Sequence, residues 1–163
     1  MDFEALPAGE SARREALLEA FGEQLFQSRN ERLRSIERIL KDATAREKLG
    51  AIHAKPYDAV ARLGEQAVSP GVGLCKAAID NYIYHLLGMF TNQGSDLRVG
   101  PKHALRYRLV AEVIDVQTLE VVEHADINRN TEKALVSYFG RWLNRYASLP
   151  AAGGEGGGPE GAG

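Results

Sequence analysis

A nearly apolar stretch of twenty residues, 72–91, constrains the fold of this chain more than any other feature. Its apolar side chains recur at the i, i+3, i+4 spacing of a core-facing helix: Val72, Cys75, Ile79, Tyr82, Ile83, Leu86 and Phe90. Leu87 and Met89 widen the apolar arc until little polar surface remains. Because a helix that is apolar on most sides has to be covered on most sides, the sequence predicts a central helix over about residues 70–91.

Three polar residues, Asp80, Asn81 and His85, interrupt this helix. We expect them to be at least partly buried, and a buried polar group without a partner costs about 1–3 kcal/mol. Asn81 and His85 are four residues apart and can bond each other and the backbone of a neighbouring hairpin. Asp80 can reach an arginine of the first long helix, or Lys76. The prediction is therefore a structural polar cluster that joins the helices to the hairpin, rather than a catalytic site.

The chain before the central helix is also helical in pattern. Ser11 is expected to cap a first helix, and a second apolar pattern follows over residues 31–46. No Pro or Gly lies at the junction, so we favour one continuous helix over two helices joined by a kink near Ser28. Its many charged side chains, Arg29 among them, are typical of a solvated face with local ion pairs. A linker between Gly50 and Pro56 and a short helix over residues 57–68 should follow.

The period of the pattern changes from 3.6 to 2 after residue 104. Alternating residues from 105, a reversal over 115–120 and a returning strand predict a β-hairpin over about residues 105–124. The register stays open: one choice places Glu112 opposite Glu123, and a slip of one residue relieves that repulsion but turns the second strand over. Since a lone hairpin is marginally stable in water, it must pack on the helices or pair with another copy.

A last helix is expected over residues 131–148, capped by Asn128 or Asn130. It carries the largest aromatic cluster of the chain in a stripe of Leu135, Tyr138, Phe139, Trp142 and Tyr146. The fold class is thus α+β and mainly helical, with three to four N-terminal helices around the central helix, one β-hairpin and a C-terminal helix. The expected organisation is a disordered lead over 1–10, a single domain over 11–149 and a disordered Gly-rich tail over 150–163.

Composition narrows the function classes. The net charge of −2 argues for no particular partner, and the chain has no apolar run long enough to span a membrane and no secretory signal at its start. A bacterial-type cytoplasm is the expected compartment. One cysteine, Cys75, excludes an internal disulfide and is expected to be an inert buried thiol. The four histidines are scattered without ligand spacing, so neither a metal site nor a cofactor is predicted.

Two stretches fit the Arg-x4-6-His spacing of the HEPN ribonucleases, which are helical domains: Arg46 to His53 and Arg98 to His103. The first straddles a predicted helix end at Gly50, and the second lies in a loop rich in Gly and Pro. Each departs from the helical setting in which that family carries its signature. The resemblance implies a HEPN-like ribonuclease as an alternative function, beside other small hydrolases.

The one concentrated basic stretch of the chain comprises Arg98, Lys102, His103, Arg106 and Arg108, with Tyr107 among them. Residues 112–132 are as acidic as this stretch is basic, so a charged protein partner or self-pairing explains the pattern better than nucleic acid. Arg98, Lys102, Arg106, Arg108 and the aromatic Trp142 are therefore the predicted binding residues.

No catalytic triad, paired carboxylates, metal set or cofactor loop emerges from the sequence. The leading hypothesis is a small, non-catalytic protein-binding protein of a regulatory, antitoxin or toxin-immunity type. It is expected to form a two-fold homodimer through the hairpin and the last helix. A structural subunit of a larger assembly is a further alternative.

Overall fold

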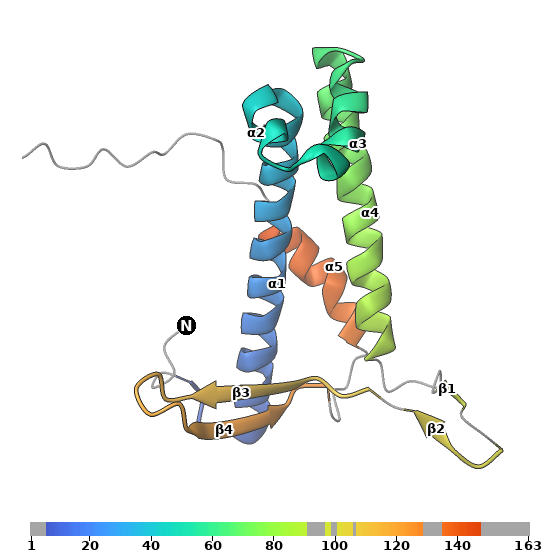
Figure 1. Cartoon of the computed structure of the whole chain (residues 1–163). Coiled ribbons are helices and arrows are strands. Elements are labelled where there is room, and N and C mark those ends of the chain that lie inside the picture. The colour runs from blue at the N-terminus through green and yellow to red at the C-terminus, as the bar shows by residue number, and fades with distance from the viewer. Residues whose placement is uncertain (1–5, 91–96, 99–100, 106, 129–134, 148–163) are drawn as a thin grey trace, which may run out of the picture.

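The computed structural model describes residues 6–90, 97–98, 101–105, 107–128 and 135–147. The mainly helical α+β class predicted from the sequence is confirmed (Figure 1). The elements in chain order are α1 Glu10–Lys41, α2 Ala43–Glu47, α3 Ala51–Ala61, a short 3-10 helix η1 Glu65–Ala67, α4 Val68–Met89, β1 Leu97–Arg98, β2 Ala104–Leu105, β3 Val110–Ile114, β4 Val121–Asp126 and α5 Leu135–Tyr146. None of the helices in the described part of the chain is both long and apolar enough to cross a membrane.

The first helix is continuous over 32 residues, as favoured from the sequence. It ends at Lys41 because Asp42 adopts an extended conformation, and the Asp42 side chain then accepts a hydrogen bond of 2.9 Å from the Thr44 N–H to begin α2. The prediction that Ser11 caps the helix is wrong. The helix starts earlier, with Gly9 at its N-cap and a 2.8 Å bond from the Arg13 N–H to the Gly9 carbonyl.

The second half of the helical region differs from the prediction in its boundaries. Residues 51–61 form α3, so the expected linker between Gly50 and Pro56 and the expected helix over 57–68 are both wrong. Gly50 lies at φ 74°, where a residue without a Cβ is favoured, and after this turn α3 starts at Ala51, five residues before Pro56. The next helix, α4, lies within two residues of its predicted bounds at each end.

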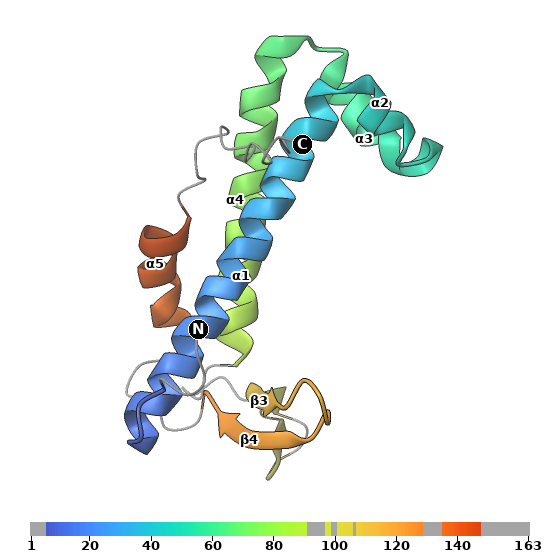
Figure 2. The same ribbon diagram turned by 90° about the vertical axis from the view of Figure 1, so that its left-hand side faces the viewer.

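The helix around which the other elements are arranged is α1, not α4. Both α4 and α5 pack along α1, α2 and α3 pack near one end of it, and β4 contacts it near the other (Figures 1 and 2). The main core is formed by Leu17, Leu18, Phe26, Ile83, Leu87, Ile127, Leu135, Tyr138 and Trp142. A smaller cluster of Ile36, Leu40 and Val68 lies further along α1.

The close contact between α1 and α5 depends on a glycine. Trp142 is fully buried, and a Cβ added at Gly22 would lie only 2.2 Å from its indole ring. Gly22 therefore lets the indole lie directly against the backbone of α1. Phe21 and Tyr138 flank the same ring, with centroids 5.9 and 5.6 Å away. The aromatic stripe predicted for the last helix thus packs inside the molecule.

The strands form two antiparallel pairs, β1–β2 and β3–β4. The first pair lies partly in a segment expected to be a loop, and the larger hairpin starts at Val110 rather than at residue 105. Its register is the one-residue slip that avoids the two glutamates: Glu112 lies opposite His124, and a bulge follows between Val113 and Ile114. The slip turns one set of side chains toward α1 and leaves the other set facing outward.

The reversal predicted over residues 115–120 is present. The Asp115 carboxylate accepts hydrogen bonds from the backbone N–H groups of Gln117 and Thr118, at 2.7 and 2.9 Å. These bonds hold the pKa of Asp115 below its usual range. Leu119 completes the turn at φ 60°, an uncommon conformation for a side chain of this size.

Candidate binding surface

Asp80 forms the contact predicted for it with the first helix. Arg29 donates two hydrogen bonds to its carboxylate, from Nε at 2.5 Å and from Nη2 at 2.9 Å, and Lys76 Nζ lies 3.3 Å away. Burial alone would raise the pKa of Asp80, but the two cations outweigh burial and hold it below its usual range. Arg29 is itself buried, so its assignment to a solvated face is wrong. This ion pair joins α1 to α4.

Asn81 and His85 do not share this setting. Both side chains are exposed, so the prediction that they are at least partly buried is wrong for these two residues. They lie on the side of α4 that faces away from α1, because α4 is covered by α1 and α5 on one side only. Only Val68, Ile83 and Leu87 of this helix are buried.

The joint between the helices and the hairpin is made by Asn128 instead. Its side chain is buried, its Oδ1 accepts from the Leu109 N–H at 2.9 Å, and its Nδ2 donates to the carbonyls of Phe90 at 2.7 Å and Tyr107 at 3.3 Å. It therefore links the end of α4 to the start of β3. Of the two predicted caps of the last helix, Asn128 has this role instead, and Asn130 lies outside the described residues. Its neighbours in sequence carry no periodic signal that could have identified it.

One face of the β3–β4 hairpin is anchored to the helices. The inner face carries Ala111, Val113, Glu123 and Ala125, and the Arg13 guanidinium of α1 donates from Nε to both oxygens of Glu123 at 2.8 Å. This hydrogen bond holds the pKa of the Glu123 carboxyl below its usual range. The inner face is thereby held against the first turns of α1.

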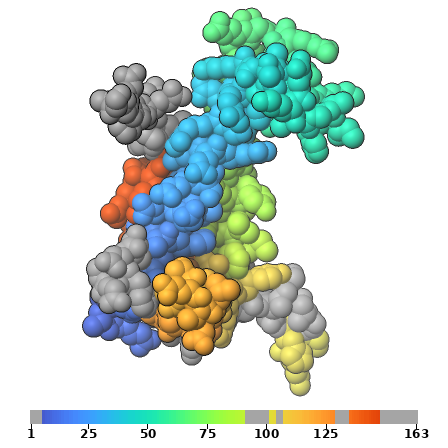
Figure 3. All heavy atoms as spheres, turned by 60° about the vertical axis from the view of Figure 1, so that its left-hand side comes forward, coloured from blue at the N-terminus to red at the C-terminus, as the bar shows by residue number. Residues whose placement is uncertain are grey.

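The opposite face of the hairpin is apolar and exposed. We define the hairpin outer face as Val110, Glu112, Ile114, Val122 and His124. Its three aliphatic residues are each about half exposed, and Glu112 and His124 lie 3.4 Å apart between them. At the reversal, Val116 and Leu119 are mostly exposed as well. In Figure 3 the hairpin (orange) lies at the surface of the molecule beside the N-terminal part of α1.

A cleft of about 630 Å³ lies between the start of α1 and the hairpin. Its walls are charged: Glu10, Arg13, Arg14, Arg108, Glu123, His124 and Asp126, with Val110 and Ala125. Most of these charges are paired within the chain, since Arg13 binds Glu123 and Arg108 lies 3.3 Å from Asp126. Arg14 is half-buried on one wall and makes no ion pair with a described residue.

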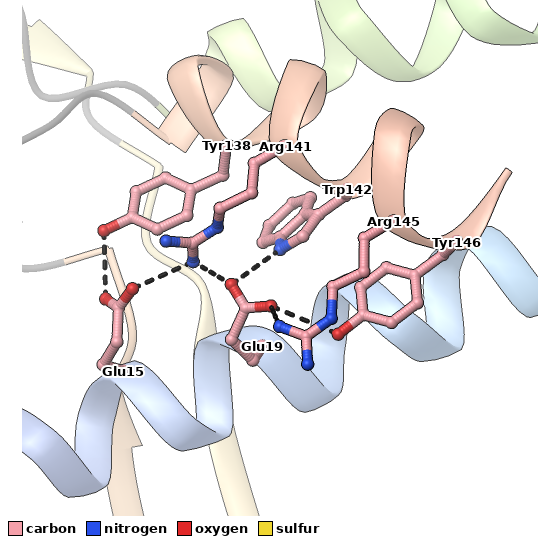
Figure 4. Close-up of polar contacts among 7 residues, drawn as sticks. All are labelled: Glu15, Glu19, Tyr138, Arg141, Trp142, Arg145 and Tyr146. Atoms are coloured by element: carbon pink, nitrogen blue, oxygen red, sulfur yellow. Dashed lines mark hydrogen bonds and ion pairs between the residues drawn. The ribbon is translucent and has the colours of Figure 1, made fainter.

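A second polar cluster joins α1 to α5 (Figure 4). The Glu19 carboxylate accepts hydrogen bonds from Trp142 Nε1 and Tyr146 Oη, both at 3.2 Å, and from Arg141. The buried indole N–H is thus satisfied by a charge on the neighbouring helix. This acidic side chain therefore acts in packing α5.

Glu15, one turn before Glu19, is occupied in the same way. Tyr138 donates to it at 3.0 Å and Arg141 at 2.9 Å, and the Arg141 guanidinium lies 4.5 Å from the centre of the Tyr138 ring. Both carboxylates are held by donors from α5. Their arrangement is that of an interhelix joint rather than of an acid–base pair.

The predicted binding residues are only partly brought together. Lys102 and Arg108 are exposed, and Arg108 pairs with Asp126 of the acidic segment. Arg98 belongs to β1, but its side chain lies outside the described residues, as does all of Arg106. The β1–β2 pair projects away from the helices (Figure 1). Trp142, in contrast, is fully buried, so it is not available at a surface.

The Arg–His pairs that resemble the HEPN signature are placed as follows. Arg46 donates to the carbonyls of Ile39 and Leu40 at 3.0 and 2.8 Å and to Asp58 at 3.1 Å, so it closes the turn between α1 and α3. His53 lies exposed on α3, and His103 is exposed next to β2. The Arg98 side chain lies outside the described residues.

Within the described part of the chain, no three His, Cys, Asp or Glu side chains are grouped so that they could hold a metal ion. Cys75 is half-buried, rather than buried as predicted. Comparisons with protein-family models, with curated proteins and with solved structures found no match to this chain.

Proposed function

We propose that this protein acts by binding another protein at the hairpin outer face, as a small non-catalytic regulatory protein of the antitoxin or toxin-immunity type. The observation that carries the proposal is a two-stranded sheet that exposes aliphatic side chains to solvent. Ile114 and Val122 stand on the outer face near Val116 and Leu119 of the reversal, and Val110 lies beyond the Glu112–His124 pair. Scattered exposed apolar residues are ordinary, but several on one small hairpin are typical of an interaction surface.

The anchoring of the opposite face supports this role. Glu123 is held by Arg13, and Asn128 fixes the base of the hairpin to the end of α4. A partner would therefore meet a surface whose backbone is already positioned, which lowers the entropic cost of association.

The chemistry of the surface favours a partner that supplies an extended segment. Among the described residues, neither β3 nor β4 pairs with a third strand, so each has an edge of backbone N–H and C=O groups that can accept one. Side chains that alternate between apolar and polar would fit beside the aliphatic residues. The Glu112–His124 pair would meet polar groups of the same partner strand.

The test compares two variants with wild-type protein. Ile114→Lys/Val122→Lys places two charges on the hairpin outer face, and the control Ile52→Lys places one on the largely exposed Ile52 of α3. Proteins captured from cells of the source organism by wild-type protein, but not by the hairpin variant, are purified and titrated by calorimetry. We expect direct binding that the hairpin substitutions weaken at least about tenfold, or about 1.4 kcal/mol, and that the control leaves unchanged.

Two results would contradict the proposal. One is that every protein that binds directly binds the hairpin variant and the wild type equally. The other is that no captured protein binds the purified chain at all. Amide hydrogen exchange on a confirmed complex gives a further check, because strand addition should protect backbone N–H groups at one edge of the hairpin.

A further inference from the structure

The exposed side of α4 is an unusual surface for a helix of 22 residues. The helix has only two charged residues, Lys76 and Asp80, and both belong to the ion-pair cluster with Arg29. The exposed side carries six residues that we call the α4 stripe: Leu74, Ala78, Asn81, Tyr82, His85 and Met89. All six are exposed, and at 100° per residue they lie within an arc of about 100°.

The stripe has the spacing of a helix–helix seam. Leu74, Ala78, Asn81 and His85 follow one another at intervals of four, three and four residues, as in the a and d positions of a heptad repeat. Tyr84 lies to one side, where its ring packs 5.7 Å from that of Phe139 in α5. Of the α4 stripe, His85 lies at this border, with its ring 5.7 Å from that of Tyr84.

No described element of the chain covers the stripe. The segments outside the described residues contain at most two large apolar side chains each, Met1 and Phe3 in the first and Leu149 in the last. A covering helix needs apolar residues over the roughly 22 Å from Leu74 to Met89. A helix of another molecule can supply these residues.

We infer that the partner is a second copy of the chain, packed with its α4 antiparallel about a two-fold axis that passes between residues 81 and 82. This axis places Leu74 opposite the partner copy's Met89, so that large apolar side chains meet at both ends. It also places the small Ala78 opposite His85, and Asn81 opposite Tyr82, where amide and hydroxyl groups can bond. The same patch is used by both copies, as a two-fold interface requires.

The lack of charge on the stripe suits such a pair, and the area is that of a weak one. An uncharged stripe meets its own copy without the like-charge repulsion that a charged face would suffer. Leu74 is 73% exposed, Tyr82 68% and Met89 54%. With about 150–250 Å² for a fully exposed large side chain, these three offer on the order of 400 Å² per copy. This is below the roughly 800 Å² per partner of a standard interface, so we expect a dissociation constant in the micromolar range.

Sedimentation equilibrium of the full chain from about 1 to 200 μM, with two charge designs, tests the inference. Leu74→Lys/Met89→Lys sets like charges against each other in either orientation, and should weaken the dimer at least about tenfold. Leu74→Lys/Met89→Glu sets opposite charges together in the antiparallel pair, and should dimerise within about threefold of wild type. In a parallel pair this second design would bring like charges together. Because these residues are exposed, the helicity of both variants should equal that of wild type.

The hairpin variant Ile114→Lys/Val122→Lys is the matched control and should dimerise as wild type does. A wild-type chain that remains monomeric at about 200 μM would overturn the inference, and the stripe would then be open to a different protein. A dimer that tolerates Leu74→Lys/Met89→Lys would place the interface elsewhere. If both charge designs are equally weak, the antiparallel arrangement is wrong. None of these outcomes affects the proposed function, which rests on the hairpin.

Discussion

The substitution Asp80→Ala tests the joint between α1 and α4. It removes the carboxylate that accepts two hydrogen bonds from Arg29, and among the described residues Asn30 Oδ1, at 2.7 Å, is then the acceptor left to that guanidinium. The Arg29 side chain is 1% exposed and that of Asp80 is 15% exposed, so water can replace the lost partner only in part. The substitution therefore leaves a buried charge only partly compensated.

The expected loss of stability lies between the values for exposed and for fully buried ion pairs. Exposed pairs contribute about 0.2–1 kcal/mol, and removal of one partner from a fully buried pair costs about 3–5 kcal/mol. Because Asp80 retains some contact with water, we expect Asp80→Ala to lower the free energy of unfolding by about 2–3 kcal/mol. With a urea dependence of about 1–3 kcal/mol per molar, the unfolding midpoint should fall by about 0.7–3 M.

Urea titrations of a double-mutant cycle provide the assay. Arg29→Met removes the charge while keeping an apolar side chain beside Phe26, so Arg29→Met/Asp80→Ala should be more stable than Asp80→Ala alone. Lys76→Ala is the control. Its side chain is half exposed and forms an i,i+4 pair, so its loss should cost no more than about 0.5 kcal/mol.

The same ion pair makes stability depend on pH. The folded pKa of Asp80 is lowered, so the protein gains stability from this group above the unfolded pKa of about 3.9 and loses it as the pH falls toward the folded pKa. The difference in stability between wild type and Asp80→Ala should therefore shrink as the pH is lowered from about 5 to below 3.

Two results would refute this reasoning. An unchanged midpoint for Asp80→Ala would mean that Arg29 does not depend on its partner. A double variant less stable than Asp80→Ala would mean that the guanidinium stabilises the fold through other contacts.

Three further predictions concern packing and the tail. Gly22→Ala should lower the free energy of unfolding in urea by about 1–3 kcal/mol, because the added Cβ would overlap Trp142. The control Gly140→Ala, which has open space around it in α5, should be neutral or stabilising by up to about 1 kcal/mol. Equal effects of the two substitutions would contradict the contact between Gly22 and Trp142. Glu19→Ala should lower stability in thermal unfolding by about 1–3 kcal/mol, because the buried indole N–H of Trp142 loses its acceptor. An unchanged melting temperature would show that another group accepts from that N–H. Deletion of residues 151–163, which contain no large apolar side chain, should leave the melting temperature unchanged, and a clear fall would show that the tail packs on the fold.

The elements that could be predicted from the sequence are those with a local cause. The continuous first helix, α4 and α5 follow from apolar residues at helical spacing, and the reversal at Asp115 follows from turn chemistry within a few residues. The contact between Asp80 and an arginine of the first helix was also foreseeable, because a carboxylate on a mostly apolar helix needs a partner.

Other features depend on contacts between residues far apart in the chain. Trp142 packs against Gly22 because α5 crosses α1 at that residue. The sequence signal for this contact was an isolated glycine inside a helical pattern. Asn128 serves three elements at once, and nothing in its local pattern distinguishes it from a helix cap. The hairpin register was open between two choices until the packing of one face against α1 selected the slip.

Local periodicity was enough to predict a helix over about residues 70–91 that is apolar around most of its circumference, and α4 spans Val68–Met89. Which side of that helix is covered depends on the packing of the other elements. Periodicity sets how a segment folds locally, but burial depends on how many other elements can reach it, and here α1 and α5 cover one side. Ile83 and Leu87 are therefore in the core, while Leu74, Tyr82 and Met89 face solvent because no described element packs over them.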